Sequence, residues 1–297
     1  MITDESNVTD GANDPRTVAV NVGNTHIGVA SLAGSRVLVS SVFAIDAEDT
    51  ALARIRALAE EAPPESAPVV VIASVHDAVA RRITASLQDD PAMTVDQPVA
   101  TLQMGVDLVM PMRHALGENH TTGMDRFLAA LAAFDAMKQA CAVVDAGTAI
   151  TVDFVDGEGV YHGGVIAPGL EMSLRALHEH TAQLPLIRAQ TRSEEETFPK
   201  STKAAMQTGV SLAACGLVRI VVERFAERFG AYPKVVATGG DAEMLFGDDP
   251  FVDKVAPDLV LQGIGLARLT AMGLFGASAA ASRETDEPDA SAGLSAL

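Results

Sequence analysis

The sequence predicts an α/β protein built from two similar halves that face each other across a cleft. Strand-like and helix-like segments alternate along most of the 297 residues, and a hydrophobic content of 48% is sufficient for two cores of ordinary domain size. A short motif also occurs twice, at residues 20–25 and 144–148. Each copy has an apolar strand, a polar residue, a spacer, a glycine and a hydroxyl or amide side chain. The repetition predicts duplicated domains that each contribute one glycine loop to the cleft.

The first predicted domain spans residues 17–118. Short β-branched segments and turn signals predict strands at residues 17–22, 27–32, 36–44 and 68–75. Helical periodicity predicts helices at residues 47–62 and 77–88. Residues 1–16 are polar and acidic and cannot bury enough surface to offset the entropy of ordering, so a disordered tail is expected there.

The second predicted domain spans residues 119–276. Apolar residues recur on one face of a predicted helix at 123–138, and a strand at 142–145 leads to a hairpin of 150–155 and 160–162. A long helix at 203–229, a strand at 234–238 and a closing helix at 259–274 follow. Residues 277–297 are small, polar and acidic, and a second disordered tail is expected there.

Charge and composition narrow the classes of partner. The formal net charge of −18 leaves no basic field that could hold a nucleic acid or an anionic membrane. The N-terminal residues contain no apolar core, and no uninterrupted apolar stretch reaches membrane-spanning length. The two cysteines, Cys141 and Cys215, indicate neither a disulfide framework nor a metal site. We therefore expect a soluble protein of the cytoplasm.

The repeated glycine loops are candidate anion sites. Gly23 and Gly147 would let backbone amides approach a phosphate closely, and hydroxyl and amide donors lie beside them at Asn24, Thr25 and Thr148. Either loop alone could be a tight turn between strands, but two matched loops favour phosphate binding. A third glycine element, residues 238–240, lies between a strand and a helix. It could contact adenosine or phosphate, or form an ordinary turn with Asp241 as the helix N-cap.

Asp125 is the carboxylate with the clearest catalytic potential. A base for hydroxyl phosphorylation needs a carboxylate at the end of a rigid element, and the neighbouring Arg126 could hold an anionic substrate. The alternative is structural, because Thr122 and Asp125 have the spacing of a helix capping box. The motif alone leaves both interpretations open.

Two further features have more than one interpretation. Asp145 could bind a hard cation, or it could satisfy the amides of its own loop. Residues 163–169 contain more glycine than a strand usually tolerates. This pattern indicates close backbone approach to a ligand or another subunit, or else an irregular connection into a helix at Leu170.

Taken together, these motifs resemble the type III pantothenate kinases of the actin-like, ribonuclease H-like phosphotransferase superfamily. Residues 21–25 match the family pattern D-x-G-N-T except at its first position. Residues 123–126 match G-x-D-R, and residues 145–149 match D-x-G-T-A. The segment 163–169, the region of Thr202 and residues 238–240 follow in the family's order, so the resemblance extends from about Val18 to Leu274.

The resemblance implies transfer of a phosphoryl group from ATP to pantothenate, giving 4'-phosphopantothenate in the first step of coenzyme A synthesis. It implies that Asp125 is the general base and that Asp145 binds a monovalent cation, K⁺ or NH₄⁺, while Mg²⁺ accompanies the nucleotide. The implied pantothenate contacts are Gly123, Met124, Asp125, Arg126 and Thr202. The implied ATP contacts are Asn21, Val22, Gly23, Asn24, Thr25, His26, Ile27, Gly28, Thr148, Gly239 and Gly240. A homodimer whose active site is partly shared between subunits is also implied.

Asn21 departs from the family pattern and keeps alternatives open. An amide retains hydrogen bonding but lacks the negative charge that would help to organise Mg-ATP. One alternative is therefore a catalytically weakened regulator that binds nucleotide or pantothenate. Some relatives are described as accessory transcription factors, although the absence of a basic stripe argues against direct DNA contact. A third alternative is another actin-like enzyme, such as a sugar kinase, or a hydrolase. The short chain and the G-x-D-R element argue against a sugar kinase, but similarity of fold alone does not exclude it.

Overall fold

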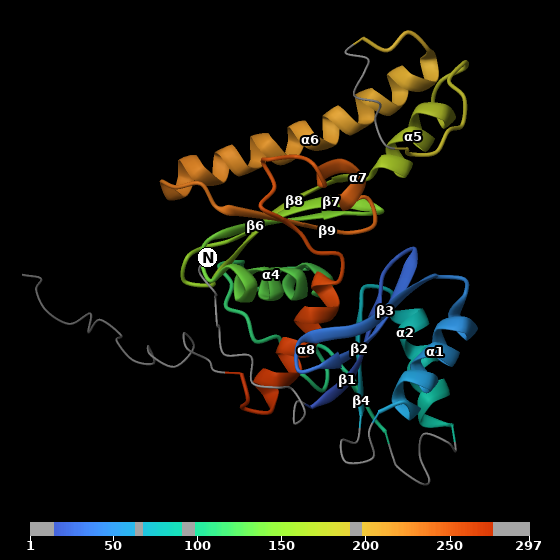
Figure 1. Cartoon of the computed structure of the whole chain (residues 1–297), viewed down its shortest axis with the longest axis vertical. Helices are drawn as coiled ribbons and strands as arrows, with labels where there is room; N and C mark the ends of the chain where they lie inside the picture. Colours follow the sequence, from blue (N-terminus) through green and yellow to red (C-terminus); the bar gives the residue numbers. More distant parts are fainter. Residues whose placement is uncertain (1–14, 63–67, 91–98, 191–197, 276–297) are drawn as a thin grey trace, which may run out of the picture.

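The first half of the chain forms a sheet with helices on its outer face. The computed structural model describes residues 15–62, 68–90, 99–190 and 198–275, and over these residues the chain forms two five-stranded sheets (Figure 1). The first sheet has the order β3-β2-β1-β4-β5. Its strands are β1 (Arg16–Val22), β2 (His26–Ala33), β3 (Arg36–Ala44), β4 (Val69–Ser74) and β5 (Ala100–Gln103). Helices α1 (Glu48–Glu60) and α2 (Asp77–Gln88) pack on this sheet through apolar residues such as Ile55 and Ile83.

The second half repeats this arrangement. Its sheet has the order β10-β9-β6-β7-β8. The strands are β6 (Cys141–Ala146), β7 (Ala149–Val155), β8 (Tyr161–Pro168), β9 (Lys234–Thr238) and β10 (Lys254–Val255). The outer helices are α5 (Leu170–Glu179), α6 (Thr202–Phe229) and α7 (Ala242–Phe246). In Figure 1, α6 runs along the outer side of this sheet.

The two sheets correspond strand by strand. In each, the first strand pairs antiparallel with the second and parallel with the fourth. The correspondence extends to single positions: Asn21 of β1 lies between Gly28 and Ala73, and Asp145 of β6 lies between Thr151 and Thr238. The predicted duplication and the predicted fold class are therefore confirmed.

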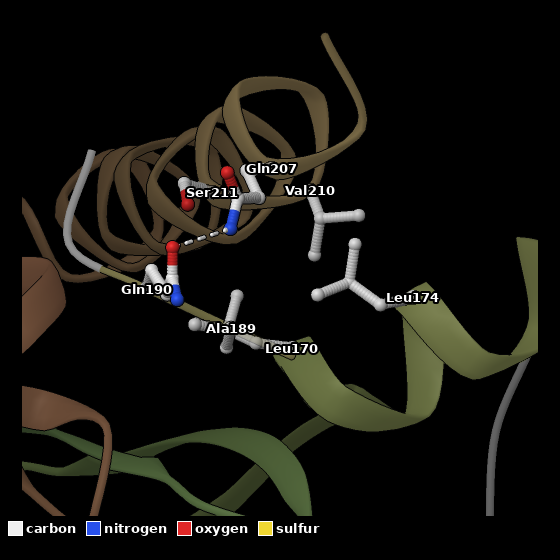
Figure 2. A pocket seen from close by; sticks show the side chains of 7 residues that line it. All are labelled: Leu170, Leu174, Ala189, Gln190, Gln207, Val210 and Ser211. Atoms are coloured by element: carbon white, nitrogen blue, oxygen red, sulfur yellow. Dashed lines mark hydrogen bonds between the residues drawn. The ribbon is translucent and has the colours of Figure 1, made fainter. Parts of the chain in front are cut away.

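A small pocket lies between α5 and α6. Figure 2 shows that side chains from both helices and from the segment between them converge there. The lining residues are Leu170, Leu174, Ala189, Gln190, Gln207, Val210 and Ser211. The Gln207 amide donates hydrogen bonds to the Arg188 carbonyl at 3.2 Å and to Gln190 Oε1 at 3.4 Å. The pocket is bounded on one side by Leu170, which follows Gly169, and the Gly169 N–H donates to the Thr148 carbonyl of the second glycine loop at 3.1 Å.

Helix α6 is unusually apolar for its exposure. Among the described residues it is the one helix long and apolar enough to cross a membrane by length and composition, although polar residues interrupt its apolar sequence. Its most apolar 18-residue window contains few charges, although charged residues flank it. Only 28% of that window is buried. Exposed apolar side chains include Leu212 and Ile220 on α6 and Ile166 on β8.

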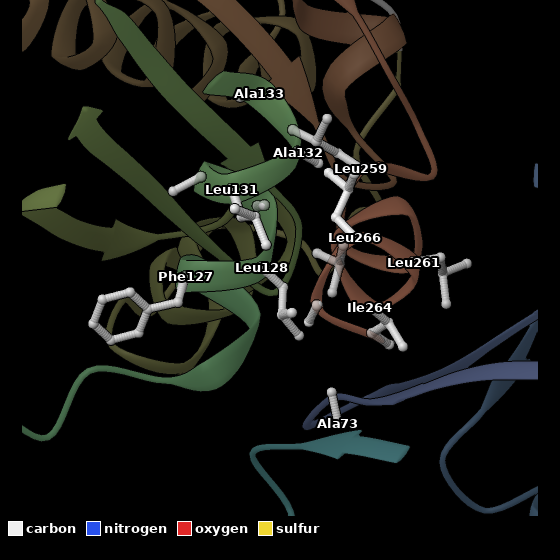
Figure 3. Packing of buried hydrophobic residues seen from close by; sticks show 14 of the residues in the cluster. Ala73, Phe127, Leu128, Leu131, Ala132, Ala133, Leu259, Leu261, Ile264 and Leu266 are labelled. Carbon is white, nitrogen blue, oxygen red and sulfur yellow. The ribbon is translucent and has the colours of Figure 1, made fainter. Parts of the chain in front are cut away.

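Helices α4 (Met124–Met137) and α8 (Leu259–Ala271) lie between the two sheets. Figure 3 shows their apolar side chains packed against each other, with Ala73 of the first sheet nearby. The helices cross closely, because a Cβ at Gly263 would lie only 2.1 Å from the Leu128 carbonyl oxygen. The buried Arg268 donates to Thr17 Oγ1 at 2.7 Å and also to the Arg16 carbonyl. The chain's last described helix is thus fastened to its first strand.

Most predicted elements are present, with two differences. Strand β8 continues through Pro168, whereas the glycines at 163 and 164 suggested an irregular segment. The close approach at Gly164 is made to the neighbouring strand, since a Cβ there would lie 2.0 Å from the Val152 carbonyl oxygen. The short strands β5 and β10 were not predicted. The predicted tails lie outside the described residues apart from residues 15 and 16, and Arg16 begins β1.

Candidate active site

The two glycine loops meet directly. The hydroxyl oxygens of Thr25 and Thr148 lie 2.6 Å apart, although 123 positions separate these residues in the sequence. Each loop is closed by a backbone bond: Gly23 N–H donates to the His26 carbonyl at 2.9 Å, and Gly147 N–H donates to the Ala149 carbonyl at 3.0 Å. The loops are therefore ordered independently and brought together by the packing of the two halves.

The third glycine element packs against the second loop. Gly239 has φ +95°, and a Cβ there would lie 2.4 Å from both Asp145 Oδ1 and the Ala146 carbonyl oxygen. The left-handed backbone and this close approach both require glycine. Asp241 N–H donates to the same Ala146 carbonyl at 2.9 Å. Asp241 is the N-cap of α7, as one interpretation of the sequence predicted, although its side chain makes no capping hydrogen bond in the described part of the chain.

Asp125 lies in the first turn of α4. The helix N-cap is Gly123 in an extended conformation, with no side-chain cap among the described residues, so the capping-box interpretation with Thr122 is wrong. Asp125 Oδ1 instead accepts the Arg126 N–H at 2.8 Å. Glycine at 123 leaves room for this carboxylate, because a Cβ there would lie 2.5 Å from Asp125 Oδ1.

Arg126 is held by a partner from the second sheet. Its Nε and Nη2 donate to Asp153 Oδ2 at 3.0 Å and to Asp153 Oδ1 at 2.5 Å. The buried Tyr161 donates its hydroxyl to Asp153 Oδ1 at 2.6 Å. Asp153 is itself 2% exposed. This carboxylate, which carries three hydrogen bonds, was not among the residues predicted from the sequence.

The site carries an excess of negative charge. Burial raises the pKa of Asp125, and the Asp153 carboxylate adds to this effect, while the N–H and the charge of Arg126 oppose it. Burial raises the pKa of Asp145 to about 7, and the carboxylates of Asp125 and Asp153 contribute to this rise. Asp145 therefore has two neighbouring carboxylates that raise its pKa, which favours a cationic ligand near Asp145.

A cation at Asp145 would need ligands other than a cluster of acids. Among the described residues, no group of three or more histidine, cysteine, aspartate or glutamate side chains has the geometry to hold a metal ion. Backbone carbonyls, hydroxyls and substrate oxygens are suitable ligands for a weakly bound monovalent cation. Thr151, opposite Asp145 in the sheet, has a buried Oγ1 without a hydrogen-bond partner in the described chain.

Asn21 occupies the corresponding position in the first loop. Its Oδ1 is buried and has no hydrogen-bond partner within the described ranges. An unsatisfied buried acceptor costs about 1–3 kcal/mol. The loop therefore retains an unused oxygen that fits a hydrogen-bond donor or a hydrated cation, as Mg-ATP would provide.

The structure brings together most of the predicted site residues. The Asn21–Gly28 hairpin, Thr148 and Gly239 belong to the three loops described above, and Gly123–Arg126 begins α4. Val22 and Ile27 are fully buried, so only their backbone could contact a nucleotide. Thr202 is the exception: it begins α6 on the outer face of the second sheet, whereas α4 lies on the inner face.

Comparison with known proteins identifies the family. The model of the type III pantothenate kinase family matches residues 17–224. A type III pantothenate kinase of Dehalococcoides mccartyi is 30% identical over 256 residues, which is 84% of this chain and 95% of the relative. The enzyme of that name from Rhodospirillum rubrum is 38% identical over 174 residues, which is 59% of this chain and 64% of the relative.

A solved structure supports the fold alone. It is a Campylobacter jejuni protein named for a Baf family of transcriptional activators, with a TM-score of 0.53 and 18% identity, covering 86% of this chain and all of the other. The family model extends over well more than half of the sequence and includes both glycine loops and Asp125. The chain belongs to the type III pantothenate kinase family.

Proposed function

We propose that this protein transfers the γ-phosphoryl group of ATP to the primary hydroxyl of pantothenate, giving ADP and 4'-phosphopantothenate, the first step of coenzyme A synthesis. The observation that carries the proposal is the position of Asp125, a half-buried carboxylate with a raised pKa at the rigid start of α4. It lies in the same site as a fixed guanidinium. The family match supports the choice of substrates.

Asp125 acts as the general base. Its carboxylate accepts the proton of the pantothenate hydroxyl as that oxygen attacks the γ-phosphorus and ADP leaves. Its pKa is raised by burial, which makes it a stronger base than an exposed aspartate. Oδ1 is already engaged by the Arg126 N–H. The remaining oxygen, Oδ2, is therefore the expected proton acceptor.

The glycine loops bind ATP. The backbone amides around Gly23 and Gly147 and the hydroxyls of Thr25 and Thr148 would surround the phosphates, with Gly239 and Gly240 closing the site. Asn21 Oδ1 is the acceptor that would hold the hydrated Mg²⁺ of the nucleotide. When bound, Mg²⁺ neutralises charge on the phosphates during transfer.

Asp145 binds the monovalent cation. The carboxylate has a pKa of about 7 because it is buried near Asp125 and Asp153. A bound K⁺ or NH₄⁺ would favour the ionised carboxylate and offset the local negative charge. Thr151, whose hydroxyl has no hydrogen-bond partner in the part of the chain that the structure describes, is a suitable additional oxygen ligand.

Arg126 recognises the carboxylate of pantothenate, with Gly123 and Met124 forming the adjoining wall.

Thr202 lies across the second sheet from Asp125 in the same chain, so it would reach a pantothenate site only from a second copy. A homodimer that buries the exposed apolar residues Leu212 and Ile220 of α6 would provide this arrangement. We therefore propose that the protein is a cytoplasmic homodimer.

The alternative of a non-catalytic regulator rests on Asn21 alone. Asp125, Arg126, Asp145 and Thr148 are all in place, and the family match does not favour the alternative. Across the described ranges, Asn21 Oδ1 also has no hydrogen-bond partner, so it can accept a hydrogen bond from a ligand. We therefore expect turnover.

The direct test is a coupled assay of ADP release with purified protein, ATP, Mg²⁺, K⁺ and pantothenate. Asp125→Asn should lower kcat by about 10²-fold to 10⁴-fold, the usual contribution of a general base. Asp135→Asn, a change of the same kind on the same helix, affects a half-buried residue paired with Lys138 near the other end of the helix and should leave kcat unchanged. A parent protein that releases no pantothenate-dependent ADP would contradict the proposed function.

The shared site is tested by mixing inactive subunits. If Asp125 and Thr202 of one site come from different chains, an Asp125→Asn chain paired with a Thr202→Ala chain contains one intact site. Random mixing should then restore roughly a quarter of the parent activity. Activity no higher than the mean of the two separate variants would overturn the shared site.

The dimer interface is tested separately with Leu212→Glu. This variant should shift the protein toward the monomer in analytical ultracentrifugation, because it introduces a charge into the proposed apolar interface.

A further inference from the structure

The position of Arg126 is controlled by a residue that lies in another element. Asp153 is the fifth residue of β7, with Val143 of β6 on one side and Gly164 of β8 on the other. Its two carboxylate oxygens accept from Nε and Nη2 of Arg126 at 3.0 Å and 2.5 Å. This side-on contact with two parallel bonds fixes both the place and the plane of the guanidinium.

The surroundings of Asp153 are built to hold it in this geometry. Tyr161 is fully buried, and its hydroxyl donates to Asp153 Oδ1 at 2.6 Å. Gly164 leaves space for the carboxylate, because a Cβ there would lie 2.6 Å from Asp153 Oδ1. A carboxylate that is 2% exposed is stable only when it is paired and hydrogen-bonded, and Asp153 satisfies both conditions.

The contact divides the guanidinium into two edges. Of its five N–H groups, Asp153 engages one on Nε and one on Nη2. The remaining N–H groups, on Nη1 and Nη2, are free of Asp153. The Arg126 side chain is 14% exposed, so only a limited part of it reaches the site.

The contact also separates Arg126 from its neighbour in the chain. Asp125 accepts the backbone N–H of Arg126, so the two charged side chains leave adjacent positions at the start of α4. Without a partner on β7, the guanidinium would be drawn to the Asp125 carboxylate and would occupy the oxygen needed as a base. Asp153 therefore affects both substrate binding and the base.

We propose that Asp153, supported by Tyr161, is a positioning residue that holds Arg126 away from Asp125 and directs its free edge to the carboxylate of the substrate. Asp153 itself touches neither ATP nor pantothenate. The proposal rests on the proposed function, since the carboxylate belongs to pantothenate. It predicts that Asp153 determines the preference for an acid over a neutral analogue.

The test compares two substrates in the full-length protein. Asp153→Asn keeps the shape but removes the charge that fixes Arg126. We measure kcat and KM for pantothenate and for an N-alkyl pantothenamide, which has the same hydroxyl but no carboxylate. The ratio of kcat/KM for the acid over the amide should fall by about 10-fold to 100-fold, mainly through KM for pantothenate, as expected for a lost charge-assisted contact.

Two further variants keep the test decisive. Tyr161→Phe removes one hydrogen bond from Asp153 but no charge. It should lower the ratio of kcat/KM for the acid over the amide, by less than about 10-fold. This variant keeps the proposal testable if Asp153→Asn does not fold. Asp156→Asn is the matched control, because Asp156 pairs with His162 at the turn after β7 and should leave the ratio unchanged.

The outcomes separate the two proposals. A parent protein that phosphorylates neither compound contradicts the proposed function. If the parent is active but Asp153→Asn and Tyr161→Phe lower activity on the acid and on the amide equally, the variants act on the fold. Asp153 would then only stabilise the fold and would not position Arg126. An unchanged ratio in Tyr161→Phe, where Asp153→Asn is insoluble, would overturn the positioning role in the same way.

Discussion

The first and second glycine loops share one backbone plan but differ in charge. Asn21 and Asp145 occupy corresponding positions at the ends of β1 and β6. The neighbours of Asn21 across the sheet are Gly28 and Ala73, whereas those of Asp145 are the hydroxyl-bearing Thr151 and Thr238. Duplication has thus preserved the loop geometry while the polar groups have become concentrated in the second half.

The difference explains how one fold can assign separate tasks to two similar loops. The second loop lies close to the carboxylates of Asp125 and Asp153, which raise the pKa of Asp145 in addition to the effect of burial. The first loop has a neutral amide whose oxygen accepts no hydrogen bond from any residue that the structure describes. A charged loop suits a directly bound cation, and a neutral loop suits a hydrated one. Three changes would break or sharpen this comparison.

The largest effect is expected from Asp145→Asn, which makes the second loop neutral like the first. Activation by K⁺ should disappear, with a fall in kcat at least comparable to the ~10-fold to 100-fold typical of disturbing a metal site. Measurement of kcat against K⁺ concentration checks this expectation. Retained K⁺ activation would show that the cation binds elsewhere.

The same variant should change the pH dependence of stability. The pKa of Asp145 is raised to about 7 in the folded protein from an ordinary value near 4, so the folded state binds more protons between these values. Its contribution to stability is therefore lost as pH rises toward 7. Without K⁺, Asp145→Asn should be more stable than the parent at pH 8 by on the order of a few kcal/mol, with little gain at pH 4. Thermal melts at the two pH values measure the difference.

A smaller effect is expected from Asn21→Asp, which gives the first loop the charge of the second. The introduced carboxylate would be buried without a partner, so the melting temperature of the nucleotide-free protein should fall. Mg-ATP should restore it, and KM for Mg-ATP should decrease by several-fold, about 1 kcal/mol. Asn24→Asp adds the same charge at an exposed position of the loop and should not lower the melting temperature. An equal fall in both variants would indicate a general effect of charge.

The smallest effect is expected at the contact between the loops. Thr25→Val, Thr148→Val and the double variant form a cycle that measures the coupling across the 2.6 Å contact. In the nucleotide-free protein, we expect a coupling of about 0.5–1 kcal/mol from chemical denaturation. A bound ATP analogue should abolish it, because the phosphates would enter between the two hydroxyls. Unchanged coupling with the analogue bound would argue against phosphates at this place.

The repeat, the hairpins and most helices could be predicted because they depend on local patterns. Strand β8 was predicted too short because glycine weakens the strand signal, and only the neighbouring β7 shows why Gly164 is needed. The boundary between the domains stays a prediction, and α8, assigned to the second domain by sequence, packs on the first sheet.

The predicted site residues were those in short motifs, and the missed ones act through long-range contacts. Asp153 lies between Val152 and Phe154, and a lone acid in an apolar strand is the one signal that could have indicated a buried partner. Its pairing with Arg126, 27 positions earlier, depends on how α4 packs on the second sheet. The separation of Thr202 from Asp125 likewise depends on which face of the sheet each helix covers.

The attachment of α8 to β1 has a consequence for synthesis of the chain. Arg268 and Thr17 are 251 positions apart, yet their hydrogen bond joins the last described helix to the first strand. On the ribosome, the inner face of the first sheet therefore stays only partly covered, by α4, until residues 259–271 have emerged. A nascent chain that stops before residue 259 would expose that apolar face, which makes truncated products candidates for chaperone binding and degradation.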